Sequence, residues 1–161
     1  MKNIEVINLH NEIINNNEIK KLKGIKLSLL LLENIEIIGN FIKKIEKSVQ
    51  QSDDYKEYEK KRVSLCEEYA EKGEDSKPKT IKKDGNTEYV INVTDEFNKK
   101  MKKLNESYND AILEQVEKID EYNKFILEDC ELDLKKIDSK LLPEDVSFEV
   151  IKILKPILET K

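Results

Sequence analysis

The hydrophobic pattern is strongest between residues 28 and 72. Apolar side chains recur there at alternating intervals of four and three residues, which places them on one face of an α-helix. The stripe consists of Leu31, Ile35, Ile38, Ile42, Ile45 and Val49, and after a skip at Ser52 it resumes at Tyr55, Tyr58, Arg62, Leu65 and Tyr69. A phase slip of this kind lets a helix continue while its buried face turns. The pattern predicts one long helix over 28–72.

A second stripe of the same kind predicts a long helix over 95–129. Thr94 or Asp95 can cap its start. The apolar positions are Phe97, Met101, Leu104, Tyr108, Ile112, Val116, Ile119, Tyr122 and Ile126. Neither helix can hide its apolar face alone, and the short connection allows only an antiparallel return. We therefore expect the two stripes to pack against each other as a helical hairpin, and the same stripes also allow self-association.

The segment between the two helices has the pattern of a β-hairpin, over 77–93. Pro78 prevents the first helix from continuing. Asp84 and Gly85 form the dipeptide that favours a tight turn, and Tyr89 begins an alternating return strand. The pattern predicts a β-hairpin at the tip of the helical hairpin.

The two ends of the chain, 1–27 and 130–161, predict a small base of short strands and helices. Residues 3–8 alternate as in a strand, and a brief helix is expected from 10 to 23. The run 130–137 alternates as well, which suggests a strand that could pair with the first one. A last helix is expected to begin at Pro143 and to end or bend at Pro156. The predicted fold is α+β and predominantly α, in a single elongated domain, 1–161.

Composition supports long exposed helices. Charged residues are 39% of the 161 residues, well above the usual quarter, and the net charge is −5. The acidic excess lies in 128–149, where eight acids face three lysines. That window could imitate a phosphate backbone toward a basic partner, although a fluctuation of surface charge explains it more simply.

The inventory of reactive side chains is thin. His10 is the single histidine, and neither Cys66 nor Cys130 has the local signature of a thiol enzyme or a partner at metal-ligand spacing. The four glycines do not gather into a phosphate-binding loop. The sequence predicts no catalytic residue, no metal site and no cofactor, and both cysteines are expected to be reduced.

Nucleic acid and membrane are poor candidates for the partner. The tip, 72–90, carries five lysines and four acids, so it offers no strong phosphate-neutralising patch. The tyrosines Tyr55, Tyr58 and Tyr69 are spaced for a helix seam. The longest apolar run, 29–32, is far below the ~20 residues that span a bilayer, and the N-terminus lacks the apolar core of a signal peptide.

A set of short elements stands out over residues 26–158: Leu65, Glu68 to Lys72, Pro78, Leu142 to Asp145, Leu154 and Pro156. In these elements the chain resembles an uncharacterised family of small phage proteins from low-GC Gram-positive hosts, whereas "GEDS" replaces the family's Asp-Glu-x-Gly turn. The resemblance implies a phage or prophage origin and action in the host cytoplasm, and it supplies no active site. The order helix, β-hairpin, helix is also similar to a prefoldin-type chaperone subunit.

These observations favour a non-catalytic protein-binding factor that interferes with a host protein or defence complex. A charged, rigid arm suits docking onto a partner surface. The expected contact residues are Lys77, Lys79, Lys82, Lys83 and Tyr89 at the tip, then Glu131 and Asp133 on the acidic strand. The alternative is a virion-assembly factor or prefoldin-like assembly chaperone that acts as an oligomer.

Overall fold

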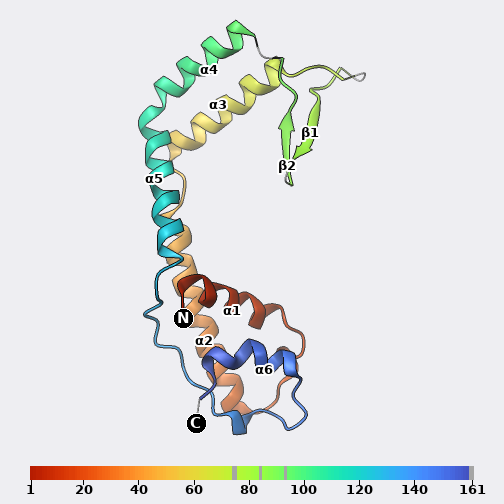
Figure 1. Ribbon diagram of the computed structural model, residues 1–161, viewed down its shortest axis with the longest axis vertical. Coiled ribbons are helices and arrows are strands. Elements are labelled where there is room, and N and C mark those ends of the chain that lie inside the picture. The colour runs from red at the N-terminus through yellow and green to blue at the C-terminus, as the bar shows by residue number, and fades with distance from the viewer. Residues whose placement is uncertain (74–75, 84, 93, 160–161) are drawn as a thin grey trace. The chain divides into compact units, whose positions relative to one another are not determined.

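The computed structural model describes residues 1–73, 76–83, 85–92 and 94–159 (Figure 1). The helices are α1 (Asn3–Asn15), α2 (Ile25–Ser48), α3 (Asp53–Tyr69), α4 (Asp95–Ser107), α5 (Asn109–Phe125) and α6 (Phe148–Leu154). Three short 3₁₀ helices are η1 (Ile19–Lys21), η2 (Ser139–Leu141) and η3 (Lys155–Ile157), and the strands are β1 (Thr80–Lys83) and β2 (Asn86–Tyr89). The described residues thus form a predominantly helical α+β fold, as the sequence predicts.

The chain divides into two compact units. Unit 1 combines Met1–Val49 with Ile119–Lys161, and unit 2 is Gln50–Lys118. Unit 1 contains the hydrophobic core, whereas unit 2 carries the β-hairpin. Each unit is described by itself below.

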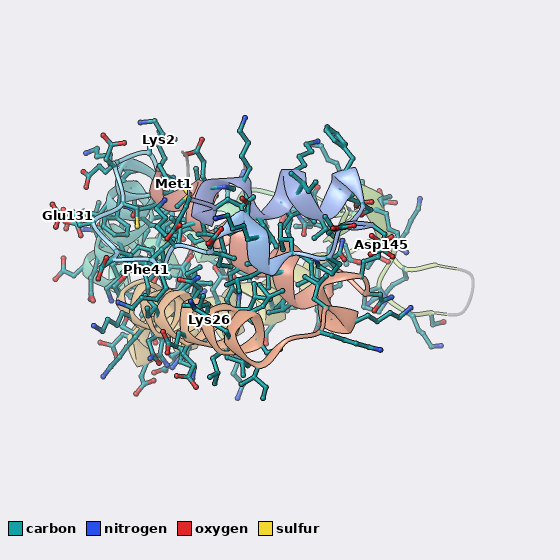
Figure 2. All side chains as sticks on the ribbon, turned by 90° about the horizontal axis from the view of Figure 1, so that it is seen from below. Met1, Lys2, Lys26, Phe41, Glu131 and Asp145 are labelled. Atoms are coloured by element: carbon teal, nitrogen blue, oxygen red, sulfur yellow. The ribbon has the colours of Figure 1, made fainter. Side chains whose placement is uncertain are left out.

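The core of unit 1 forms around α2. Figures 1 and 2 show α1 and α6 on the same side of this helix. The buried side chains are Val6, Leu9, Ile13, Ile19, Leu27, Leu31, Ile38, Ile137, Val150, Ile153, Leu154 and Ile157. The first part of the predicted stripe is therefore buried, but mainly by the two ends of the chain. Within unit 1 it also meets the second predicted helix, where the centroids of the Phe41 and Phe125 rings are 5.9 Å apart.

The first residues are helical, so the predicted strand over 3–8 is wrong. Val6, Leu9 and Ile13 have helical spacing and are all buried. The start of α1 is capped by a side chain, because the Lys2 backbone N–H donates a hydrogen bond to the Glu5 carboxylate over 2.7 Å. Burial of the 3.6-residue pattern outweighs the short two-residue alternation that suggested a strand.

Both predicted long helices are interrupted. The first stripe skips at Ser52 because α2 ends at Ser48 and α3 begins at Asp53; the Ser52 hydroxyl accepts a hydrogen bond from the Tyr55 N–H. The second helix is divided at Tyr108 and ends at Phe125 rather than 129. Thr94 caps α4 as predicted, accepting from the Phe97 N–H over 3.1 Å. The skip in the first stripe therefore marks the end of one helix and the start of the next, and not a continuous helix whose buried face turns.

The C-terminal segment differs in two ways from the prediction. Residues 130–137 bury Ile137 and half-bury Leu132 and Leu134, but they form only isolated bridges in the described chain. The last helix begins at Phe148 instead of Pro143, because the Ser147 hydroxyl accepts from the Val150 N–H and caps it. The expected end at Pro156 is confirmed, since α6 gives way to η3 there.

In unit 2, α3 and α4 lie side by side (Figure 1), joined by an aromatic seam. The Tyr58 hydroxyl donates to Asn105 over 3.1 Å, and its ring lies 6.0 Å from that of Tyr108. Tyr69 contacts Phe97 at 5.5 Å. The expectation that Tyr58 and Tyr69 pack in a helix seam is confirmed, and the seam holds α3 against α4.

Gly39 to alanine is expected to stabilise the protein. A methyl group there would lie 3.5 Å from Nε2 of His10, which is an ordinary van der Waals contact. Alanine also has a higher helix propensity than glycine. The free energy of unfolding should rise by about 0.5–1 kcal/mol in urea denaturation. Gly85→Ala is the matched control and should lower it, because Gly85 has φ +83° in the hairpin turn. A loss at Gly39 would show that α1 needs the glycine to approach α2.

Candidate functional site

The β-hairpin of unit 2 is hydrogen-bonded to the chain that leaves α3. The Glu71 N–H donates to the Val90 carbonyl over 2.8 Å, and the Glu71 carbonyl accepts from the Lys79 N–H, also over 2.8 Å. The Asn92 N–H donates to the Tyr69 carbonyl over 3.0 Å. These bonds hold the base of both strands against the end of α3, so the hairpin has a defined place in the unit.

The register of the hairpin shows which backbone groups point outward. Thr80 pairs with Tyr89 and Lys82 with Thr87. Val90 donates to the Lys79 carbonyl, and hydrogen-bonded and non-hydrogen-bonded pairs alternate along an antiparallel ladder. The pairs Thr80–Tyr89 and Lys82–Thr87 are therefore the non-hydrogen-bonded ones. Their N–H and C=O groups point away from the hairpin, and the sheet has only these two strands among the described residues.

The two outer edges differ in what they face. In Figure 1, β2 is the strand nearer α3. A groove of about 420 Å³ lies between them, lined by Arg62, Val63 and Cys66 of α3 and by Asn86, Thr87, Glu88, Tyr89 and Ile91. Its walls thus combine a strand edge that lacks a third strand with a partly apolar helix face. Such an edge is a template for pairing with another extended chain.

Two polar side chains of the groove, Arg62 and Tyr89, are paired within the protein. Arg62 donates two hydrogen bonds to Glu59, at 2.9 and 2.8 Å, which raise the pKa of its guanidinium. The Tyr89 hydroxyl donates to the Glu67 carboxylate on α3, and this bond raises the pKa of the phenol. The groove therefore offers apolar surface at Val63 and Ile91 together with the exposed carboxylate of Glu88.

Cys66 forms part of the groove wall as a protonated thiol. It is 6% exposed, and burial raises its pKa. Nucleophilic cysteines have a lowered pKa, so this thiol fits a packing role. Both cysteines are free, which agrees with the expectation of reduced thiols.

The tip residues expected to bind a partner lie on this hairpin but do not form one patch. Lys82 and Tyr89 are on one face, because cross-strand pairs share a face and side chains alternate along a strand. Lys83 is on the opposite face. Lys79 pairs with Glu71 over 3.4 Å, and Lys77 is exposed before the first strand. The hairpin predicted over 77–93 is present, whereas Asp84 and Val93 lie outside the described residues.

Glu131 and Asp133 belong to unit 1. Both side chains are exposed, and Asp133 forms an ion pair with Lys135 over 3.3 Å. Figure 2 shows Glu131 near Met1 and Lys2, where the Cys130 N–H donates to the Met1 carbonyl over 2.8 Å. The segment carrying these acids is extended without belonging to a sheet of the described chain.

His10 lies on α1, where its Nε2 faces Gly39 of α2. It is half-buried, and its Nδ1 has no hydrogen-bond partner among the described residues. Among the described residues, no three His, Cys, Asp or Glu side chains lie close enough together to hold a metal ion. No described helix is both long and apolar enough to cross a bilayer.

No known family, curated protein or solved structure matches this chain. The resemblance to small phage proteins therefore stays a prediction.

The groove itself was not predicted from the sequence. The return strand was expected from Tyr89 onward, whereas β2 is Asn86–Tyr89, and Val63, Cys66 and Thr87 were not singled out as contact residues. A signal was present, because a two-stranded hairpin between two helices leaves two strand edges without a neighbour. Which edge faces a helix depends on where α3 ends, and the periodic pattern did not show that end.

Proposed function

We propose that the protein is a non-catalytic binding protein whose groove between β2 and α3 takes up an extended segment of a partner protein. The observation that carries this proposal is the groove between β2 and α3, which Thr87 and Tyr89 line from a strand without a further neighbour in the described chain, and Val63 and Cys66 line from the helix. A strand added at this edge would gain main-chain hydrogen bonds, and alternate side chains would reach Val63 and Cys66.

Thr87→Pro is expected to abolish this binding. Proline removes the outward N–H and places its ring at the edge, and it leaves the hydrogen bonds within the hairpin intact because Thr87 belongs to a non-hydrogen-bonded pair. Peptides selected from a random displayed library on the native protein should bind the variant at least about tenfold more weakly, in fluorescence polarisation.

The matched control is Lys82→Pro, which makes the same change directly across the ladder, on the edge that does not face α3. Peptide affinity should stay within about twofold. Equal binding by the Thr87→Pro variant, or a loss caused by Lys82→Pro instead, would contradict the groove as the binding site. Circular dichroism checks that both variants keep the native helix content.

In its most specific form, we propose a phage-encoded inhibitor that binds a host protein or defence complex in the host cytoplasm. The support is the resemblance over 26–158 together with the exposed hairpin that carries Lys82, Lys83 and Tyr89. Tagged native protein and the Thr87→Pro variant would be used to capture partners from infected cells, followed by mass spectrometry. A host complex captured only by the native protein supports the proposal, and capture of capsid or tail proteins alone would contradict it.

A second candidate function is an assembly factor or prefoldin-like chaperone that acts as an oligomer. One observation favours it: α2 exposes aliphatic side chains on its outer side, at Ile25, Leu29 and Leu32. A self-assembling component should sediment as a stable oligomer at micromolar concentration, whereas an inhibitor that acts by direct binding need not.

A further inference from the structure

The first two turns of α2 carry a second apolar stripe, separate from the buried one. Ile25 is 83% exposed, Leu29 54% and Leu32 55%. Their intervals of four and three residues place them on one helix face. We call these three residues the outer stripe. Glu36, one turn further on, ends it with an exposed charge.

Two opposite charges flank the outer stripe on one side. Lys26 and Glu33 are seven residues apart, which is two helical turns, so they lie on the same flank. Both are exposed, and neither has an ion-pair partner in the described chain. Figure 2 labels Lys26 on α2, with α1 and α6 on the other side of the helix. The outer stripe therefore has a positive end and a negative end.

We propose that the outer stripe binds a second copy of this chain, with the two α2 helices antiparallel. Leu29 then lies at the two-fold axis against its own equivalent, and Ile25 packs against Leu32 of the second copy. In antiparallel helices the same flanks meet, so Lys26 faces Glu33 of the second copy, and the pair occurs twice. In a parallel arrangement opposite flanks would meet, and the Lys26–Glu33 pairs would not form. This self-complementarity is what a two-fold interface requires.

The expected association is weak. The outer stripe is only about 10 Å long at 1.5 Å per residue. Three aliphatic side chains from each copy and two exposed ion pairs in the whole interface fall short of the roughly 1,200 Å² of buried area that stable interfaces reach. A reversible dimer with a Kd on the order of 100 µM is the expected result. This inference does not depend on the groove in unit 2, so the Thr87→Pro variant should dimerise like the native protein.

Sedimentation velocity of the full chain, from about 10 µM to about 1 mM, tests the proposal. The native protein should shift from monomer to dimer, and Leu29→Glu should weaken the dimer at least tenfold, because two carboxylates would meet at the two-fold axis. Phe148→Gln is the control within the same unit. Phe148 is 81% exposed and lies outside the outer stripe, so its replacement should leave the dimer unchanged.

Charge reversal tests the antiparallel pairing itself. Lys26→Glu alone and Glu33→Lys alone should each weaken the dimer by about three- to tenfold. The double variant restores both pairs and should restore the native Kd. An equimolar mixture of the two single variants should form a heterodimer at native strength, because one copy then carries two acids on this flank and the other carries two lysines.

A monomer at all concentrations would overturn the proposal. So would a dimer that Leu29→Glu leaves intact, or one that Phe148→Gln dissociates. If Leu29→Glu dissociates the dimer but the mixed single variants do not associate, the antiparallel pairing is wrong. Circular dichroism at low concentration confirms that each variant is folded.

Discussion

Replacing Asn34 with alanine is expected to lower the free energy of unfolding by about 2–3 kcal/mol. Asn34 lies on α2 with 0% of its surface exposed. Its amide donates to the Lys135 carbonyl over 2.9 Å, and its carbonyl accepts from the Lys135 N–H over 2.8 Å. One side chain thus pairs with the chain 101 residues away in the way a neighbouring strand would.

The cost arises because both backbone groups of Lys135 lose their partner in a partly buried place. Each unsatisfied group costs about 1–3 kcal/mol, and the better helix propensity of alanine offsets roughly half a kilocalorie. Asn34→Asp should be destabilising as well, because a carboxylate can accept from the Lys135 N–H but repels the carbonyl. Urea denaturation followed by circular dichroism measures both variants.

Asn40→Ala is the control for Asn34→Ala. It is the same substitution on the same helix, at an exposed position. Its free energy of unfolding should change by less than about 0.5 kcal/mol. If the two alanine variants were equally stable, the pairing of Asn34 with Lys135 would not contribute to the fold.

Asn34 also shows how far the sequence could predict this fold. Helical periodicity located α2 and the direction of its buried face, and Asn34 falls between Leu31 and Ile38 on that face. The stripe of apolar residues did not single out Asn34, and periodicity cannot identify its partner. Segment 130–137 alternates like a strand because Leu132, Leu134 and Ile137 face the core. Its backbone pairs partly with the Asn34 side chain, a contact that periodicity does not encode.

The breaks within the long helices were missed for a related reason. A helix that ends at Ser48 and restarts at Asp53 keeps almost the same apolar spacing as a continuous helix with a phase slip. Ser52 followed by Asp53 and Asp54 is a helix start, since a serine cap and two acids suit the positive end. That local signal is the better guide wherever a stripe skips.

The candidate site was predicted in part. The dipeptide that contains Gly85 predicted the turn, but the alternation from Tyr89 placed the return strand too late, since β2 is Asn86–Tyr89. The exposed lysines were then the natural contact residues. The groove depends on the backbone of β2 and on the face of α3 that carries Val63 and Cys66. The pattern of side chains does not show which strand edge lacks a neighbour or faces a helix. The sequence therefore predicted a hairpin but not its binding edge.

Replacing Leu154 with alanine is expected to produce the largest loss of stability, about 2–5 kcal/mol. Leu154 is 0% exposed and ends α6, a helix of seven residues that is too short to be stable without packing. Its side chain anchors the segment whose Ile157 carbonyl accepts from the Ile137 N–H over 2.8 Å. The cavity left by alanine removes core contacts and also weakens the hydrogen bond between Ile137 and Ile157.

Ile151→Ala provides the matched comparison for Leu154→Ala, because it also shortens an aliphatic side chain on α6, at a position that is 38% exposed. It should cost less than about 1 kcal/mol, since much of the side chain already meets water. Urea denaturation of the full chain should show a lower midpoint for Leu154→Ala and a nearly native midpoint for Ile151→Ala. Equal midpoints would mean that α6 does not depend on Leu154, and that Ile153 and Ile157 alone hold the C-terminal segment on the core of unit 1.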